Sequence, residues 1–481
     1  MKVLMFGWEF PPHITGGLGT ACFGLTKALK EKGVEILFVV PKAYGDEDNE
    51  VATLIGANKI QLTQSEICFE KIENKKIHFE KTIENQLITQ QNKIEKTIDG
   101  KTEITYIEVE SHLLPYLSPE QFEKIMIENN LDPSKVFYNE FGQLTYKEEA
   151  ILKKEFSETT DFQKEEDKPF GYINFTGGYG SNLFHEVSNY AVIASIIAKN
   201  NEFDVIHAHD WLTYGAGIAA KKASGKPLVI HVHATEFDRS GENVHQFVYD
   251  LEKMGMEAAD KVITVSNLTR QTVIQRYGIS PEKVETVYNA VEPVDSALLD
   301  TKKNVKEKIV TFLGRITFQK GPEYFVEAAY KVLQKTPNVR FVMAGSGDML
   351  NKMIRRAAKL GITSKFHFTG FLKGEDVDRL FAMSDVYVMP SVSEPFGISP
   401  LEAMRSNVPV IISKQSGVSE ILQHALKVDF WDIDAIADAI YALVNYKALS
   451  ETFKSLGKQE VDNLQWINAA EEIKHIYNTT N

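Results

Sequence analysis

Residues 385–404 read DVYVMPSVSEPFGISPLEAM, a short apolar run followed by a turn and then by a helical pattern. The apolar run at 386–389 has the length and composition of a buried β-strand. Ser399 followed by Pro400 is typical of the N-cap and the first position of a helix. A strand joined to a helix by a turn is the repeating unit of parallel α/β sheets, which bind ligands at the carboxyl ends of their strands. The stretch therefore predicts both a fold class and the position of a binding site.

Two glutamates stand on this turn, eight residues apart. Pro395 favours an extended conformation for Glu394, and a carboxylate there caps no helix and needs a partner once it is buried. We therefore expect Glu394 to bind a ligand. Glu402 leaves two interpretations open. It has the spacing of a capping box with Ser399, in which it would bond the Ser399 N–H, but it can equally contact a ligand.

The same alternation of strand and helix fills two long parts of the chain. Strands are predicted at residues 3–8, 34–40, 205–208, 228–232 and 261–265, and again at 309–314, 340–345, 366–370, 386–389 and 408–412. In the second part a helical pattern follows each strand. Alternation of this kind indicates parallel sheets covered by helices on both faces. The predicted fold class is α/β, with two doubly wound Rossmann-like domains that face each other across a cleft.

Composition suggests where the domains divide. Residues 293–308 carry four lysines and few apolar residues, which is typical of a linker. The predicted N-terminal domain covers residues 1–295 and contains an insertion at 43–180 that carries no catalytic signal. The predicted C-terminal domain covers residues 296–462. Residues 463–481 are expected to form a helix that packs back on the N-terminal domain.

Charge and cysteine content exclude several classes of protein. The 481 residues have a net charge of −13, which opposes binding to nucleic acid. No apolar run is long enough to span a bilayer, and the apolar opening is too short for a signal peptide, so we expect a cytoplasmic protein. Cys22 and Cys68 cannot by themselves make a disulfide framework or a zinc site, which agrees with a reducing compartment.

Basic residues follow the strand predicted at 309–314. Arg315, Lys320 and Gly321 lie on the loop before a helix that is expected to begin at Pro322. A guanidinium, an ammonium and the free N–H groups of a helix N-terminus suit a diphosphate leaving group, on which charge builds as its bond breaks. Scattered cations are usually only solvated, but cations at the end of a parallel strand favour a diphosphate site.

Two His-x-His pairs end neighbouring strands of the first domain, His207 with His209 and His231 with His233. Alternate residues of a strand share one face, so a metal site is one interpretation. We favour another, in which these histidines are half-buried and hydrogen-bonded to the backbone, because no third ligand stands out at a suitable spacing. No metal is therefore predicted.

A glycine-rich turn, GGLG at residues 16–19, precedes the helix predicted at 20–32. Glycines at such a turn either let helix and strand approach closely or bring backbone N–H groups to a phosphate. The residues alone leave both interpretations open.

Several of these motifs resemble those of a known family. Residues 394–402 resemble the Glu-x7-Glu signature of retaining GT-B glycosyltransferases, and residues 314–321 resemble the Arg, Lys, Gly pattern of glycogen and starch synthases. Asp210 and His233 stand in stretches similar to the His-Asp-Trp and Val-His motifs of glucan synthases. Ile14 departs from the pattern, because that family usually has a lysine two residues before the glycine pair.

The resemblance implies a role for each matched residue. Arg315 and Lys320 would hold the diphosphate, and Glu394 and His233 would bond the donor sugar. Glu402 would bond the ribose. The other residues implied at the nucleotide-sugar site are Asp210, which shapes the sugar pocket, Gly17 and Gly19, which approach the phosphates, Gly345 and Phe371, whose backbone holds the base, and Phe396 and Gly397.

The implied activity is that of a retaining glucosyltransferase. Such an enzyme moves glucose from ADP-glucose or UDP-glucose to the non-reducing end of an α-1,4-glucan, and it needs no metal or other cofactor. Three alternatives remain: a related transferase with another acceptor (a cell-surface glycan, a lipid or a small sugar), a nucleotide-sugar epimerase, and a non-catalytic glucan-binding protein. The donor base and the oligomeric state stay open.

Overall fold

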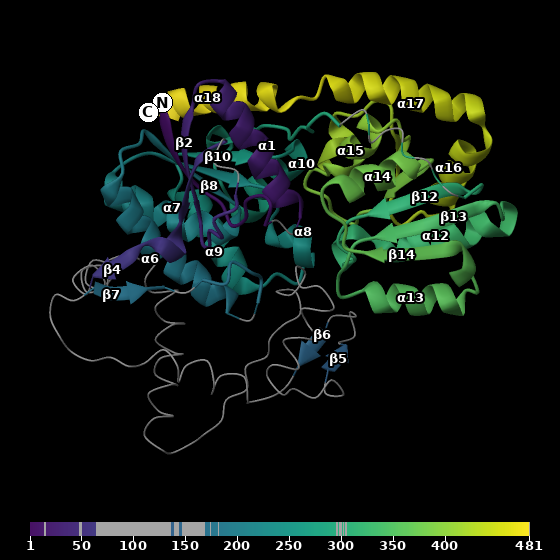
Figure 1. Ribbon diagram of the computed structural model, residues 1–481, viewed down its shortest axis with the longest axis horizontal. Coiled ribbons are helices and arrows are strands. Elements are labelled where there is room, and N and C mark those ends of the chain that lie inside the picture. Colours follow the sequence, from purple (N-terminus) through teal and green to yellow (C-terminus); the bar gives the residue numbers. More distant parts are fainter. Residues whose placement is uncertain are drawn as a thin grey trace, which may run out of the picture.

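Two parallel β-sheets with helices on their faces lie side by side (Figure 1). The computed structural model describes residues 1–13, 16–47, 51–63, 136–138, 144–146, 169–173, 175–180, 182–294, 297, 301, 303 and 305–480. Ile14 and most of the insertion predicted at 43–180 lie outside the described residues. The predicted α/β class, with two doubly wound halves, is confirmed.

The N-terminal sheet has seven parallel strands in the order β11-β10-β9-β8-β1-β2-β3. The strands are β1 (Lys2–Phe6), β2 (Glu35–Val40), β3 (Thr53–Gly56), β8 (Val205–His209), β9 (Leu228–Val232), β10 (Lys261–Thr264) and β11 (Val284–Thr286). The sequence did not predict β3 and β11. Both are short strands at the sheet edges with partly exposed side chains, so neither contains a continuous apolar run.

Helices cover both faces of this sheet because its central strands alternate between two cores. They are α1 (Gly17–Glu31), α6 (Leu183–Asn200), α7 (Trp211–Ser224), α8 (Glu236–Ser240), α9 (Gln246–Ala258), α10 (Asn267–Tyr277) and α18 (Trp466–Thr480). Leu4 and Phe6 pack in the core that contains α6 and α7 residues. Val3 and Met5 point the other way, into the core that contains α1 and α18 residues.

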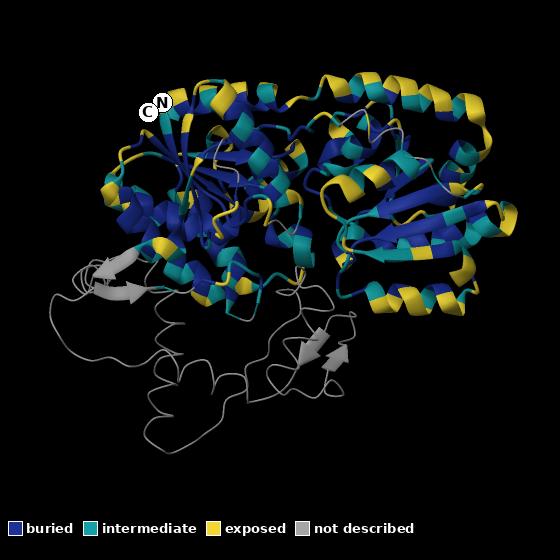
Figure 2. Ribbon diagram, in the orientation of Figure 1, coloured by how far each residue is buried: buried dark blue, intermediate teal, exposed yellow. Residues whose placement is uncertain are grey.

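The C-terminal sheet has six parallel strands in the order β14-β13-β12-β15-β16-β17. The strands are β12 (Lys308–Leu313), β13 (Val339–Ala344), β14 (Phe366–Gly370), β15 (Val386–Met389), β16 (Val410–Ser413) and β17 (Leu426–Val428). The covering helices are α12 (Pro322–Lys335), α13 (Leu350–Lys359), α14 (Glu375–Met383), α15 (Ser399–Arg405), α16 (Ile433–Asn445) and α17 (Lys447–Asp462). Figure 2 shows the central strands of both sheets buried and the outer faces of α13 and α17 exposed.

One part of the predicted alternation is wrong. We expected an α-helix after the strand at 408–412, but β16 is followed by a single 3₁₀ turn, η8 (Gly417–Glu420), and then by β17. The turn is tight because Gly417 packs directly on the other half of the molecule. A Cβ atom at Gly417 would stand 2.1 Å from the Pro395 carbonyl oxygen and 2.4 Å from Cβ of Ser266.

The C-terminal helix α18 runs back over the N-terminal sheet, and the two chain termini lie close together (Figure 1). It packs against α1, where Gly24 makes room for the indole of Trp466. Near its end, the Tyr477 hydroxyl lies 2.5 Å from Nδ1 of His207 on β8. Helix α18 therefore reaches the core beneath the two histidine pairs.

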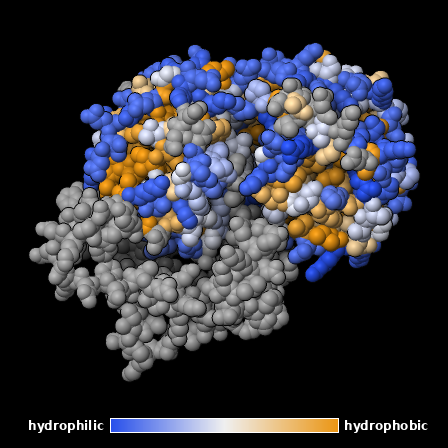
Figure 3. Space-filling view, viewed as in Figure 1, coloured by the Kyte–Doolittle hydropathy of each residue, from blue (hydrophilic) through white to orange (hydrophobic). Residues whose placement is uncertain are grey.

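Two short antiparallel pairs complete the described elements: β4 (Gln61–Thr63) with β7 (Pro169–Tyr172), and β5 (Val136–Tyr138) with β6 (Leu144–Tyr146). Figure 3 shows hydrophilic side chains spread over the rims of both halves in this view. Within the described ranges, none of the helices is both long enough and apolar enough to cross a membrane.

Candidate active site between the two sheets

A cleft of about 500 Å³ separates the carboxyl ends of the two sheets. Both halves contribute to its walls, as expected for facing doubly wound sheets. It brings together eleven of the predicted site residues: Gly17, Asp210, His233, Arg315, Lys320, Gly345, Phe371, Glu394, Phe396, Gly397 and Glu402. Gly19 is the exception, because it is buried in α1 and does not line the cleft. The helix begins at Gly17, three residues before the predicted start, so Gly19 lies inside its first turn.

Glu394 is held from both sides by the backbone. Its N–H donates to the Gln415 carbonyl (3.0 Å) and its carbonyl accepts from the Gly417 N–H (2.9 Å). The carboxylate accepts a hydrogen bond from Nζ of Lys320 (2.6 Å) and another from the Ser391 hydroxyl (3.2 Å). Glu394 is only 7% exposed, so the lysine supplies the partner that a buried carboxylate needs.

The loop after β12 carries Lys320 to this position because of Gly321. Gly321 has φ = 62°, and a Cβ atom there would stand 2.1 Å from the carbonyl oxygen of Pro390. Only glycine allows the loop to pack this closely on the end of β15. On the same loop, Nη2 of Arg315 donates to the side-chain oxygen of Gln319 (2.9 Å). Both predicted cations therefore stand at the cleft, one beside a carboxylate and the other beside an amide.

The expected N-cap at Ser399 is wrong. Helix α15 begins at Ser399 itself, with Ile398 at the N-cap, so Pro400 occupies the second helical position. No side-chain cap bond forms at this helix start, and the capping box that we considered for Glu402 is therefore absent from this described helix. Instead Glu402 lines the cleft, where burial raises the pKa of its carboxyl while nearby Arg405 opposes the shift.

Asp210 has a strained backbone, and one oxygen of its carboxylate accepts two hydrogen bonds. Its φ of 63° is unusual for a residue with a side chain. The carboxylate caps α7 by accepting from the Trp211 N–H (2.7 Å), and it also accepts from Nη2 of Arg239 (2.8 Å). Arg239 in turn pairs with Glu252 (2.7 Å), whose pKa burial raises to about 8. This network fixes Asp210 at the cleft wall.

The four histidines form one stack across β8 and β9. Neighbouring rings in the stack lie 4.2–5.3 Å apart between centroids. We expected these side chains to be half-buried and to bond the backbone. The first part is wrong for His207, His209 and His231, which are buried, and the second is wrong for the three rings that make hydrogen bonds, because they bond other side chains. Nδ1 of His207 meets the Tyr477 hydroxyl, and Nδ1 of His209 stands 2.9 Å from Nε2 of His233. Both partners are side chains, because the backbone groups of these parallel strands are already paired within the sheet.

His233 is uncharged at neutral pH. Burial lowers its pKa to about 4, and the negative charge of Asp210 only partly opposes that shift. A neutral imidazole can donate or accept one hydrogen bond at the cleft without bringing a positive charge.

Sequence reasoning missed several cleft residues, namely Glu9, Tyr179, Asn289, Glu292, Lys373, Asp378, Arg405 and Trp466. Arg405 could have been found, because it lies three residues after Glu402 on the same helix and residues at that spacing share a face. It pairs with Asp378 (2.6 Å) and donates to the Glu292 carbonyl. Trp466 could not have been found, because only the return of α18 brings it to the cleft.

Direct hydrogen bonds join the two halves beside the cleft. The Ser266 hydroxyl donates to the Pro395 carbonyl (2.5 Å), and the Ser393 hydroxyl donates to Asp238 (2.6 Å). Glu420 accepts from the free N–H groups of Asn267 and Leu268 at the start of α10. These contacts hold the halves together on either side of Glu394.

Family models match three successive parts of the chain. The starch synthase catalytic domain matches residues 2–111, glycosyltransferase family 4 matches residues 161–294, and glycosyl transferases group 1 matches residues 298–460. An uncharacterised glycosyltransferase of Methanocaldococcus jannaschii is 32% identical over 296 residues, which are 58% of this chain and 75% of that protein. A glycogen synthase of Mycobacterium tuberculosis is 24% identical over 283 residues, covering 57% of this chain and 68% of that protein.

Solved structures share the fold. Sucrose-phosphate synthase from Thermosynechococcus elongatus superposes with a TM-score of 0.64 at 16% identity, over 99% of this chain and 98% of that one. The Anabaena HepE protein in complex with UDP-glucose superposes with a TM-score of 0.53 at 19% identity, over 60% of this chain and 82% of that one. The chain therefore belongs to the GT-B glycosyltransferases. Within them it is similar to the glycogen synthases, as its motifs indicated.

Proposed function

We propose that this glycosyltransferase moves glucose from ADP-glucose or UDP-glucose to the non-reducing end of an α-1,4-glucan, with retention of configuration. The observation that carries the proposal is the meeting of Arg315, Lys320, Glu394 and His233 in one cleft. The starch synthase model over residues 2–111 and the glycogen synthase relative support the choice of acceptor. UDP-glucose in the HepE complex supports the choice of donor.

The cations supply what the leaving group requires. As the bond between sugar and phosphate breaks, negative charge builds on the diphosphate, and fixed donors stabilise that charge. Arg315 and Lys320 stand on the loop before α12, and the N–H groups at the start of α1 face the same cleft. No metal is needed in this scheme, because the cations replace one.

The acidic residues and the histidine would orient the sugar nucleotide. A donor that enters the cleft brings its diphosphate to Lys320, and Glu394 then exchanges part of that ion pair for sugar hydroxyl groups. Glu402 would accept from the ribose hydroxyls, and neutral His233 would bond the sugar. Backbone near Gly345 and Phe371 would hold the base, and Asp210 would shape the sugar pocket.

A donor-by-acceptor screen tests this function. Labelled glucose from UDP-glucose and from ADP-glucose is offered to glycogen, to small sugars and to lipid-linked acceptors, and transfer is scored for each pair. We expect transfer to glycogen. Transfer only to another acceptor would identify the related transferase instead, and conversion of the donor alone would identify an epimerase. Donor binding without turnover of any kind would identify a binding protein.

A further inference from the structure

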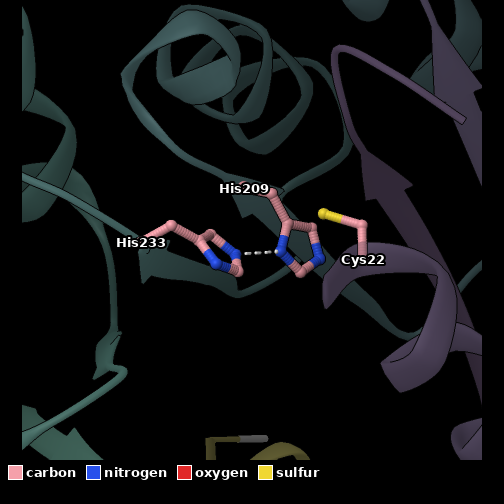
Figure 4. Close-up of side chains that lie close together, drawn as sticks. All are labelled: Cys22, His209 and His233. Atoms are coloured by element: carbon pink, nitrogen blue, oxygen red, sulfur yellow. Dashed lines mark hydrogen bonds between the residues drawn. The ribbon is translucent and has the colours of Figure 1, made fainter. Parts of the chain in front are cut away.

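Cys22, His209 and His233 lie together where α1 meets the carboxyl ends of β8 and β9 (Figure 4). Each of the three side chains offers one ligand atom, and these atoms all lie within 4.8 Å of one another. Nδ1 of His209 and Nε2 of His233 are 2.9 Å apart. The sequence showed no third ligand at a suitable spacing from the His-x-His pairs. Cys22 on α1 is such a ligand, because the fold brings this helix to the carboxyl ends of β8 and β9.

The group has the chemistry of a zinc site. One thiolate and two imidazoles are ligands that zinc favours, in a tetrahedral arrangement. With bonds of about 2.0–2.1 Å to nitrogen and about 2.3 Å to sulfur, tetrahedral ligand atoms lie roughly 3.3–3.6 Å apart. The two ring nitrogens stand 2.9 Å apart and the three ligand atoms all lie within 4.8 Å of one another, so closing the site requires movements of the side chains alone. Cys22 loses its proton to solvent when the metal binds.

The surroundings favour a cation that arrives from the cleft. Cys22 and His209 are buried, whereas His233 is partly exposed and lines the cleft wall, so it gives the ion a route inward. Nδ1 of His209 meets His233, whereas Nε2 is buried and finds no hydrogen-bond partner among the described residues, so this second nitrogen is available to a metal ion. Burial raises the pKa of the Cys22 thiol, and the carboxylates of Asp210 and Glu9 add to the shift. The same negative field attracts a metal ion.

We propose that Cys22, His209 and His233 form an inhibitory zinc site at the edge of the donor cleft. Zinc bound at Nε2 of His233, the nitrogen that meets His209, draws the ring toward Cys22, so the other ring nitrogen moves out of reach of the sugar. Metal therefore blocks transfer and is not needed for it. This inhibition rests on the proposed function of His233, whereas the binding of zinc does not.

The first test measures zinc binding without any activity. The full chain is stripped with a chelator, desalted and titrated with zinc against a chromogenic indicator, alongside Cys22→Ala, Cys22→Ser and the matched control Cys68→Ala. We expect one ion per chain, an affinity at least about tenfold weaker in both Cys22 variants, and no change in the control. Zinc affinity that is absent in the parent, or unchanged in both Cys22 variants, would overturn the proposal.

Cobalt supplies a spectroscopic test of the thiolate ligand. Cobalt(II) bound in a tetrahedral site with a thiolate gives a charge-transfer band in the near ultraviolet. We expect that band in the parent protein and its loss in Cys22→Ser. Binding without the band would place the ion at another group, such as the fully buried cluster of His207, His209 and His231, and would refute the assignment.

Glycosyl transfer then tests the inhibition itself. Zinc should inhibit the parent, EDTA should restore its activity, and Cys22→Ala should resist zinc while keeping its basal rate. If cobalt shows the thiolate band and zinc binds at the same site but transfer continues unchanged, the inhibitory role is wrong. If no transfer occurs with any donor and acceptor, the proposed function fails, and the two binding tests still decide whether the zinc site exists.

Discussion

Lys320 and Glu394 form an ion pair with an N–O distance of 2.6 Å, and their side chains are only 19% and 9% exposed. Removing one partner of such a pair leaves the other charge buried and unpaired, which destabilises the protein as well as the site. Arg315 donates to the side-chain oxygen of Gln319, and its charge opposes the rise in the pKa of the partly buried Asp348 carboxyl. Replacing either cation should consequently lower stability as well as activity.

We therefore predict that Arg315→Ala and Lys320→Ala each lose about 2–4 kcal/mol of transition-state stabilisation, the scale for one preorganised donor. The measurement is kcat/KM for donor turnover. Lys320→Ala should also lower Tm, because it leaves the buried Glu394 carboxylate without its ionic partner. Lys331→Ala serves as the control, because that lysine pairs with Asp434 at the surface. A normal kcat/KM in both site variants would refute the diphosphate role.

His233 is expected to act on the sugar and not on the nucleotide. His233→Ala should reduce kcat while the affinity for free nucleoside diphosphate, measured by calorimetry, stays almost unchanged. His231→Ala should mainly lower Tm, because the His231 ring is buried between its neighbours in the stack. Weaker binding of the free nucleotide to His233→Ala would argue against the assignment.

Glu402 forms no capping box with Ser399, so the purely structural role considered for it is not observed in α15. A carboxylate that bonds two ribose hydroxyls contributes roughly 1.5–3 kcal/mol through charge-assisted hydrogen bonds. We predict that Glu402→Gln weakens nucleotide-sugar binding by at least about tenfold, or 1.4 kcal/mol, with little change in Tm. Calorimetry on parent and variant decides the point, and equal affinities would remove Glu402 from the ribose site.

At the scale of elements, β8 and β9 carry the least ordinary feature of the fold, four stacked histidines. His207, His209 and His231 are buried and His233 is partly buried, and burial is the main reason why all four pKa values lie below the ordinary value. The unfolded chain binds these protons near pH 6.5, but the folded chain binds them only at lower pH. The unfolded state therefore holds more protons across this window, and stability falls as the pH falls.

The resulting prediction concerns acid stability. In buffer that contains a chelator, Tm should fall as the pH is lowered from about 7 to about 5. Above pH 6.5 the neutral histidines contribute their full stability, and this stability is lost progressively as the pH approaches their lower pKa values in the folded protein. His231→Leu removes one of these groups and should show a smaller fall. The exposed His475 provides the control, since His475→Gln should fall as much as the parent. An identical fall in all three proteins would show that other groups cause the acid sensitivity.

At the scale of the whole molecule, the cleft depends on how closely the two halves approach. Gly417 lies at a close contact between the halves, where its backbone meets Ser266 of the N-terminal half and the Pro395 carbonyl of its own half. A side chain at Gly417 would strike backbone that cannot move alone. The turn that carries Glu394 would have to shift with it.

We predict that Gly417→Val weakens nucleoside diphosphate binding by at least about tenfold and enlarges the radius of gyration measured by small-angle X-ray scattering. Gly417→Ala should show a smaller effect in the same direction. Gly457→Ala is the matched control, because the atom nearest to its Cβ would be the flexible end of the Met404 side chain (2.9 Å), while the backbone oxygen of His424 would lie at an ordinary contact distance (3.7 Å). Unchanged affinity in Gly417→Val would show that this contact does not set the geometry of the cleft.

Most of the fold could be predicted because its signals are local. Continuous apolar runs mark strands that are buried on both faces, and ten strands were found in this way. The edge strands β3, β11 and β17 were missed, because a half-exposed strand of three or four residues has no such run. The N-cap at Ser399 was also misplaced, since residue type alone does not fix where a helix begins.

The sequence by itself determined that two parallel α/β sheets form and which residues stand at their carboxyl ends, because both follow from the order of strands and helices along the chain. Only the tertiary structure decided which of those residues meet. The pairing of Lys320 with Glu394, the arrival of Cys22 beside His209 and His233, and the return of α18 to the cleft all join distant segments. Such contacts depend on how sheets and helices pack, and no local pattern in the sequence specifies that packing.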